Sequence, residues 1–206
     1  MELHNYVSQI LGNKVTITAL KALMRYKGKV FTVRELARLS GFSHPEISRV
    51  VKELEESGIV KLQPVGRAYQ ITLNEESYIL KSILEPLFVA EQETINSLIS
   101  TIKPLFKNKK IVSVAIFGSV ARGQERKASD VDLLIIAEDK EIASECVAEA
   151  STRTQSKFGT ALSPLIMNKR QFVRKHNQKL VKSILESYII VYGKDLREVM
   201  DLGKSG

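Results

Sequence analysis

The hydrophobic and polar positions between Phe31 and Leu73 predict two short helices, a tight turn and a hairpin. Thr32 and Ser43 are each followed three residues later by a glutamate, which is the capping-box spacing of a helix start, and Pro45 is tolerated in a first helical turn. Gly41 and Gly58 end the two predicted helices. Residues 59–64 and 67–73 alternate as strands around Gly66. The positions expected on the buried helix faces are Leu36, Leu39, Ile47, Val50, Val51 and Leu54.

The pattern over residues 74–106 predicts one long helix. Asn74 is expected to cap it, Glu75 and Glu76 suit its first turn, Pro86 should kink it and Pro104 should end it. Two apolar rows make this helix too hydrophobic for a solvent-exposed connector, so it packs on both parts of the chain or on its counterpart in a homodimer. The first row holds Ile79, Ile83, Leu87, Leu98 and Ile102, and the second Leu80, Leu84, Phe88 and Ile95.

Two apolar, largely β-branched runs, 111–117 and 131–136, predict buried strands around a polar segment. Gly118-Ser119 follows the first run, where glycine allows close approach and free backbone N–H groups suit a phosphate oxygen. Asp130 and Asp132, at the start of the second run, are two residues apart and project from one face of a strand. Two hard oxygen donors on one face suit Mg²⁺ (or Mn²⁺), which explains why a buried strand tolerates them.

Composition narrows the class of protein. The chain has 206 residues, enough for one large domain or two small ones, with 44% hydrophobic and 26% charged residues. Its longest apolar runs fall far short of the roughly 20 residues of a membrane helix, and residues 1–10 do not resemble a secretory signal. The single cysteine, Cys146, excludes an intrachain disulfide. These features favour a cytoplasmic protein that does not enter a membrane.

The positive charge is concentrated at the N-terminal end. Residues 1–73 hold 11 of the 31 Lys and Arg residues but 6 of the 23 Asp and Glu residues, which is +5 of the net +8. Such an excess suggests a polyanionic partner for this part, although lysines that serve solubility would give the same count.

The predicted helices, turn and hairpin resemble the winged helix-turn-helix of bacterial and archaeal transcription regulators, and the resemblance covers residues 13–73. The resemblance implies that helix 43–57 enters the major groove of double-stranded DNA while the wing near Gly66 lies along the backbone. The alternative is a protein-interaction module whose charges are only solvated. The residues expected on DNA are Ser48 and Arg49 towards bases, Lys52 and Arg67 towards phosphates, and His44 on the same outward face.

Gly-Ser, ten residues and then Asp-x-Asp, bracketed by two strands, resembles the nucleotidyltransferase superfamily that includes DNA polymerase beta. The sequence GSVARG…SDVDLLI looks like that of the minimal nucleotidyltransferases of prokaryotes, and the resemblance covers residues 111–193. The resemblance implies metal-dependent transfer of a nucleoside monophosphate from an NTP to a hydroxyl of a protein, an RNA or a small molecule. By position, Gly118 and Ser119 would hold triphosphate oxygens, Asp130 and Asp132 the metals, and Arg122 the phosphates, or Arg122 would be a surface arginine.

One position departs from that family, which usually places a third acid on a later strand. The matching strand is 160–168 and the aligned residue is Ser163, with no Asp or Glu between Glu149 and Glu186. The next predicted helix carries a basic run that either meets a triphosphate or nucleic acid or is a solvated face: Lys169, Arg170, Arg174, Lys175, Lys179 and Lys182.

The sequence therefore predicts an α/β (α+β) protein with a winged helix-turn-helix (1–73), a linker helix (74–110) and a nucleotidyltransferase-like domain with a small mixed sheet flanked by helices (111–206). The leading hypothesis is a DNA-binding protein whose second domain binds NTP and transfers a nucleotide. The alternatives are a transcription regulator that senses nucleotide through a weak or inactive domain, and one half of a toxin–antitoxin pair.

Overall fold

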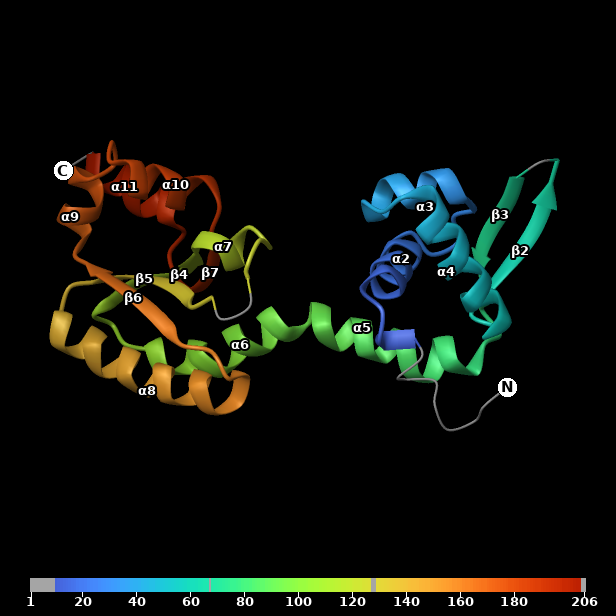
Figure 1. Ribbon diagram of the computed structural model, residues 1–206. Helices are drawn as coiled ribbons and strands as arrows, with labels where there is room; N and C mark the ends of the chain where they lie inside the picture. The colour runs from blue at the N-terminus through green and yellow to red at the C-terminus, as the bar shows by residue number, and fades with distance from the viewer. Residues whose placement is uncertain (1–9, 67, 127–128, 205–206) are drawn as a thin grey trace. The chain divides into compact units, whose positions relative to one another are not determined.

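The computed structural model describes residues 10–66, 68–126 and 129–204, and the chain forms two compact units, Met1–Glu93 and Thr94–Gly206 (Figure 1). The division falls inside the segment that the pattern predicts as one long helix. Each unit has its own hydrophobic core, and the second unit has a core on each face of its sheet.

The first unit contains the predicted helices, turn and hairpin, and a short strand that the pattern does not reveal. Its sheet has the order β1-β3-β2, with β3 antiparallel to both neighbours. A two-residue strand is too short to show an alternation, so β1 is recognised only by its pairing with β3. The elements are α2 (Lys14–Arg25), β1 (Phe31–Thr32), α3 (Val33–Ser40), α4 (His44–Glu56), β2 (Val60–Val65) and β3 (Ala68–Leu73).

The core of this unit confirms most of the predicted buried positions. All four apolar residues named on α4 are buried, as is Leu36 on α3. The expectation for Leu39 is wrong, because its side chain is 45% exposed. The buried face of α3 centres between the adjacent residues Leu36 and Ala37, so a residue three positions after Leu36 lies outside that face.

Both predicted capping boxes are present, and the first gives a stability prediction. The Thr32 hydroxyl accepts the Glu35 N–H at 3.2 Å, and the Glu35 carboxylate accepts the Thr32 N–H at 2.8 Å. The Thr32 N–H and the Thr32 hydroxyl both donate to the Glu35 carboxylate and lower its pKa. The contribution of this carboxylate to stability is therefore present above its unfolded pKa and is lost as pH falls through the folded one.

Replacing Thr32 with alanine should lower the free energy of unfolding of the first unit by about 1 kcal/mol at pH 7. The control is Thr18→Ala, which removes an exposed hydroxyl from the interior of α2 and should change stability little. Chemical denaturation of both variants tests this, and equal stability of the two would contradict it.

The segment after β3 starts its helix later than predicted. Asn74, Glu75 and Glu76 lie before the helix, and the Ser77 hydroxyl accepts the Leu80 N–H at 3.4 Å instead. A π-helical turn (Leu80–Leu84) precedes α5 (Glu85–Gln92). Pro86 has no N–H to donate to the preceding turn, and the wider π turn accommodates that missing bond.

The apolar rows of this segment are divided between the two units. Ile79, Leu80, Leu84 and Phe88 belong to the core of the first unit, whereas Leu98 and Ile102 belong to that of the second. Leu87, expected in the first row, is 44% exposed. Packing on the chain's own units therefore accounts for most of the apolar surface that suggested a homodimer, which stays a prediction.

The second unit is a four-stranded mixed sheet between two helical layers, in the order β6-β5-β4-β7, with only β5 and β6 parallel. This confirms the predicted small mixed sheet. The elements are α6 (Thr94–Ile102), a 3₁₀ turn (Lys103–Phe106), β4 (Ile111–Phe117), α7 (Gly118–Ala121), β5 (Val131–Ala137), α8 (Lys140–Phe158), β6 (Leu162–Met167), α9 (Lys169–Arg174), α10 (Lys179–Glu186), β7 (Ile189–Gly193) and α11 (Leu196–Lys204).

The alternation along β5 assigns its side chains to the two layers. Val131, Leu133 and Ile135 pack in the core with α6 and α8, whereas Leu134 and Ile136 pack in the core with α9, α10 and α11. Figure 1 shows α8 on one side of the sheet and α9–α11 on the other. Asp132 shares the parity of Leu134, so it projects on the α9–α11 face.

Candidate functional site

The end of β4 and the start of β5 meet at one edge of the sheet and bring the predicted Gly-Ser and Asp-x-Asp residues together. Phe117, the last residue of β4, pairs with Asp132 in the antiparallel ladder. Gly118 follows with φ +75°, a backbone conformation that glycine adopts readily. A Cβ at this position would lie 2.1 Å from the Asp132 Oδ2 atom, so any residue other than glycine would require the carboxylate to move.

The two carboxylates lie two residues apart at the start of β5 but differ in environment. Asp130 is exposed just before β5, whereas Asp132 is half-buried as the second residue of that strand. Burial raises the pKa of the Asp132 carboxyl, and the negative charge of Asp130 raises it further. A bound cation would stabilise the ionised form of Asp132 against both effects.

Arg122 and Ser119 complete the predicted set on the short helix α7 and at its end. The exposed Arg122 is close enough to Asp132 for its charge to lower the pKa of that carboxyl, which opposes the two larger effects. Ser119 is half-buried, and its carbonyl accepts the Gln124 N–H at 2.9 Å. The structure therefore brings all five predicted residues of this site to one edge of the sheet.

The loop that leads to Asp130 is fixed by hydrogen bonds at its end. The Arg126 N–H donates to the Ser129 hydroxyl at 2.9 Å, and the Thr160 hydroxyl donates to the Ser129 carbonyl at 3.2 Å. Thr160 lies just before β6, so the parallel neighbour of β5 helps to position Asp130. Sequence reasoning did not single out Thr160, since a lone threonine before a strand carries no pattern.

Ser163 lies beside Asp132, as the strand alignment predicted. The two residues are direct partners in the parallel ladder of β5 and β6, and Ser163 is exposed. No group of three or more His, Cys, Asp or Glu side chains that could hold a metal occurs among the residues that the structure describes. The candidate metal site accordingly consists of two carboxylates.

The winged helix presents its predicted DNA-contacting residues on the outer face of α4. His44, Arg49 and Lys52 are exposed and Ser48 is half-buried, opposite the buried apolar row. Arg49 Nε lies 3.8 Å from the Glu53 carboxylate, an exposed pair of the kind that contributes about 0–1 kcal/mol and would give way to a base. Arg67 lies outside the described residues, so its predicted phosphate contact remains a prediction.

Comparison with known families agrees with both the winged helix of the first unit and the nucleotidyltransferase-like fold of the second. Residues 100–197 match the family "Polymerase beta, Nucleotidyltransferase", and residues 14–68 match the MarR family. The chain thus combines a MarR-like winged helix-turn-helix with a domain that matches the polymerase-beta nucleotidyltransferase family.

Two curated relatives each match about half of this chain. "Putative protein adenylyltransferase MJ0604" of Methanocaldococcus jannaschii is 24% identical over 102 residues, 50% of this chain and 98% of that protein. "Putative protein adenylyltransferase MJ1305" of the same organism is 28% identical over 116 residues, 51% of this chain and 76% of that protein.

Similarity to solved structures is weaker. A crystal structure of a toxin–antitoxin with AMP-PNP covers 52% of this chain and 82% of its own, at 16% identity and a TM-score of 0.38. Similarity at this level does not support a functional assignment. Among the described residues, no helix is both long and apolar enough to cross a bilayer.

The basic run of the nucleotidyltransferase domain differs from its prediction. It is divided between two helices, α9 and α10, which are separated by residues 175–178. Asn168 and Gln171 form a capping box at the start of α9, and the Gln178 N–H donates to the Lys175 carbonyl at 2.8 Å between the helices. The sequence pattern predicted one continuous helix here, because no glycine or proline marks the break between α9 and α10.

Proposed function

We propose that the C-terminal domain binds an NTP with Mg²⁺ or Mn²⁺ and transfers its nucleoside monophosphate to a hydroxyl group. The observation that carries this proposal is the close approach of Gly118 to the Asp132 carboxylate, with Asp130 two residues before it at the start of β5. That arrangement places a backbone suited to phosphate oxygens next to acids suited to a cation. The relatives' names favour ATP as the nucleotide.

The residues present fit a magnesium-type ion. Mg²⁺ binds through one or two carboxylates and completes its shell with water and substrate phosphates, so two acids suffice for one such ion. Asp130 and Asp132 would hold it. When bound, the ion would neutralise phosphate charge and polarise the phosphoryl group.

The chain's own groups would bind and orient the nucleotide. Backbone N–H groups at Gly118 and Ser119 donate to phosphate oxygens, and the Arg122 guanidinium adds positive charge beside them. Ser163, where the family has an acid, is neutral at working pH and is a poor proton acceptor. We therefore expect firm nucleotide binding with slow transfer, unless the acceptor or a partner supplies a base.

The missing acid supports a second candidate function. With Ser163 beside Asp132, the domain would serve as a nucleotide sensor for a DNA-binding regulator, in which binding rather than turnover is the output. Measuring transfer and binding separately distinguishes the two candidates: a sensor binds NTP tightly and labels nothing.

Replacing Asp130 with asparagine tests the site itself. We expect metal-dependent NTP binding to weaken by at least about 100-fold, because removing a metal ligand costs no less than removing its supporting groups. Glu138→Gln is the charge-matched control, since Glu138 is exposed at the other end of β5. Calorimetric titration of ATP with Mg²⁺ and with EDTA is the measurement. ATP binding that survives Asp130→Asn unchanged would remove the proposal.

We also propose that the winged helix binds double-stranded DNA through α4. Lys52→Ala should weaken binding to all sequences and reduce the slope of log affinity against log salt by about 0.9, as expected for one phosphate contact. Arg49→Ala should relax sequence preference instead, because a base contact specifies sequence. Fluorescence anisotropy over a salt series measures both, and a salt-independent affinity would contradict the assignment.

A further inference from the structure

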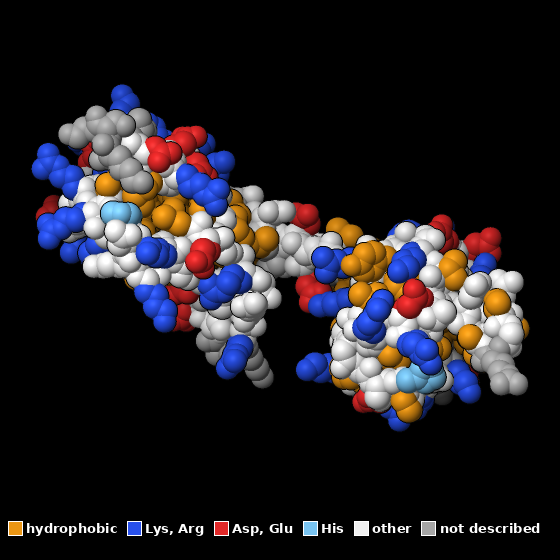
Figure 2. All heavy atoms as spheres, turned by 90° about the horizontal axis from the view of Figure 1, so that it is seen from above, with side chains coloured by type: hydrophobic (Ala, Val, Ile, Leu, Met, Phe, Trp, Pro, Cys, Tyr) orange, Lys and Arg blue, Asp and Glu red, His pale blue; other side chains and the backbone are white. Residues whose placement is uncertain are grey.

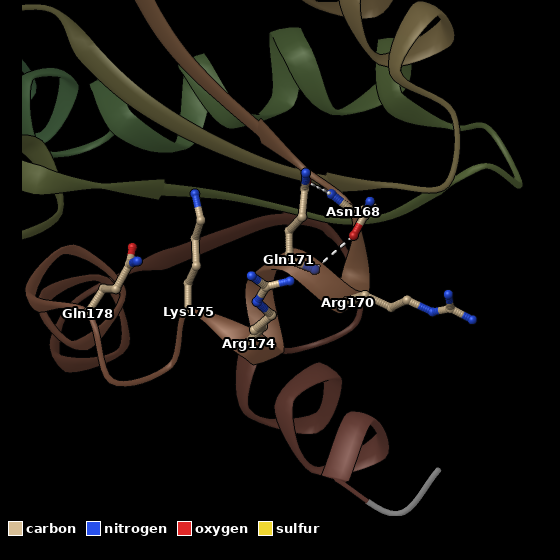
Figure 3. A pocket seen from close by; sticks show the side chains of 6 residues that line it. All are labelled: Asn168, Arg170, Gln171, Arg174, Lys175 and Gln178. Atoms are coloured by element: carbon tan, nitrogen blue, oxygen red, sulfur yellow. Dashed lines mark hydrogen bonds between the residues drawn. The ribbon is translucent and has the colours of Figure 1, made fainter.

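A basic cavity lies away from the Asp130–Asp132 site in the nucleotidyltransferase domain. Its volume is about 350 Å³, and it is formed by α9 and the segment that follows it (Figure 3). Figure 3 shows Arg174, Lys175 and Gln171 grouped on one side, with Arg170 projecting outward from the helix. The lining residues are Asn168, Arg170, Gln171, Arg174, Lys175 and Gln178.

The chemistry of this lining is that of an anion site. Three of its six side chains are cationic, the other three are amides, and none is apolar or acidic. Within the described residues, no carboxylate forms an ion pair with Arg170, Arg174 or Lys175. Guanidinium groups match the oxygens of phosphate in pairs, which makes a phosphate the best-fitting ligand.

The cavity and the Asp pair lie at opposite ends of the sheet but on the same face. Asp132 pairs with Ser163 near one end of the parallel β5–β6 pair, and Ile136 pairs with Met167 near the other. Asn168 follows Met167, five residues after Ser163, which corresponds to about 16 Å along a strand. A triphosphate held at Gly118 cannot also occupy this cavity, so its ligand is a second anionic group.

Two further basic residues extend the cationic surface from the cavity onto the first half of α10. Helix α10 starts at Lys179, directly after Gln178 of the cavity, and exposes Lys179 and Lys182. Just after its other end, the Ser187 hydroxyl donates to the Ala121 carbonyl of α7 at 3.3 Å. Figure 2 looks onto the α9–α11 face and shows Lys and Arg side chains on it among acidic and hydrophobic ones. A cationic surface that extends beyond the cavity onto α10 fits an extended polyanion better than an isolated phosphate.

We propose that the cavity binds the sugar–phosphate backbone of a single-stranded nucleic acid whose terminal hydroxyl is the acceptor at Asp130 and Asp132. This inference rests on the proposed function and specifies its acceptor. A stacked strand rises about 3.4 Å per nucleotide, so about five nucleotides cover the distance. A protein acceptor fits less well, because the lining offers no apolar side chain to anchor it.

In the transfer, the acceptor oxygen forms a bond to the α-phosphorus of the NTP. The bond from that phosphorus to the bridging oxygen breaks, and pyrophosphate leaves with the electron pair. The hydroxyl proton passes to water, since Ser163 is a poor base. The cavity takes no part in these bonds and positions the strand.

The test is anisotropy of fluorescein-labelled 12-nucleotide single strands of RNA and DNA with the full chain, over a salt series. The triple variant Arg170→Gln, Arg174→Gln, Lys175→Gln should bind at least tenfold more weakly and reduce the salt slope by about 2, as three lost phosphate contacts predict for single strands. The charge-matched control is Lys103→Gln, Arg153→Gln, Lys157→Gln, three exposed residues of the α6–α8 side of the sheet. Circular dichroism verifies that both variants are folded.

The outcomes separate this inference from the proposed function. Equal effects of the two triple variants on strand binding would overturn the inference, as would tighter binding of tripolyphosphate or of a poly-glutamate peptide than of either strand. ATP binding with Mg²⁺ should be unchanged in the cavity variant. If ATP fails to bind the unaltered protein while strand binding still depends on the cavity, the proposed function fails and the anion site remains.

Discussion

Replacing Gly118 with alanine is expected to abolish metal-dependent nucleotide binding. The added Cβ would lie 2.1 Å from Asp132 Oδ2, and the Asp132 carboxylate must move to relieve that overlap. Both groups belong to the candidate site, so one methyl group would displace a metal ligand and block the backbone that faces phosphate. We expect ATP affinity to fall by at least about 100-fold, the upper range for disturbing a ligand's support.

Gly123→Ala is the matched control for this prediction. Gly123 also has a positive φ, +63°, but a Cβ there meets nothing within 4 Å. Both substitutions therefore introduce similar backbone strain, whereas only Gly118→Ala overlaps with Asp132. Titration of ATP with Mg²⁺ should show normal affinity for the control. Loss of binding in both variants would attribute the effect to strain in the loop rather than to contact with the carboxylate.

Replacing Ser163 with aspartate is expected to raise the rate of nucleotide transfer by about 10²–10⁴-fold, the usual contribution of a general base. Ser163 is exposed, pairs directly with Asp132 and shares its face, so a carboxylate there would complete a group of three acids without a burial cost. Transfer of label from each NTP to total cell RNA and protein is the measurement.

Ser163→Asn is the control for shape, since it has the size of aspartate without the charge. It should transfer no faster than the unaltered protein. Rapid transfer by the unaltered protein would show that another group accepts the proton. A Ser163→Asp variant that binds ATP but gains no activity would favour the nucleotide-sensing function.

Local sequence signals predicted much of the secondary structure. The capping boxes at Thr32 and Ser43 and the apolar spacing of α4 depend on residues close together in the chain, so the sequence alone predicts them. The sequence did not predict where the helix after β3 starts, because Ser77 rather than Asn74 provides the hydrogen bond at its start. Both residues are polar and can cap a helix, so the sequence does not distinguish between them.

The candidate site follows a similar division. The Gly-Ser and Asp-x-Asp spacing determined which residues would meet, since strands that flank a turn pair in register and a two-residue spacing gives one face. The sequence also showed that an acid is missing near position 163. The motif spacing could not show that Gly118 lies against Asp132 Oδ2, because this contact joins residues 14 positions apart, on α7 and β5.

By itself, then, the sequence determined the two domain types, the apolar faces and the identity of the paired carboxylates, all of which depend on short-range spacing. The tertiary structure alone decided which core buries each part of the segment 74–103, and that the basic run forms a cavity at the far end of the sheet. The physical reason is that burial, register and cavity shape depend on residues distant in the chain, which no local pattern specifies.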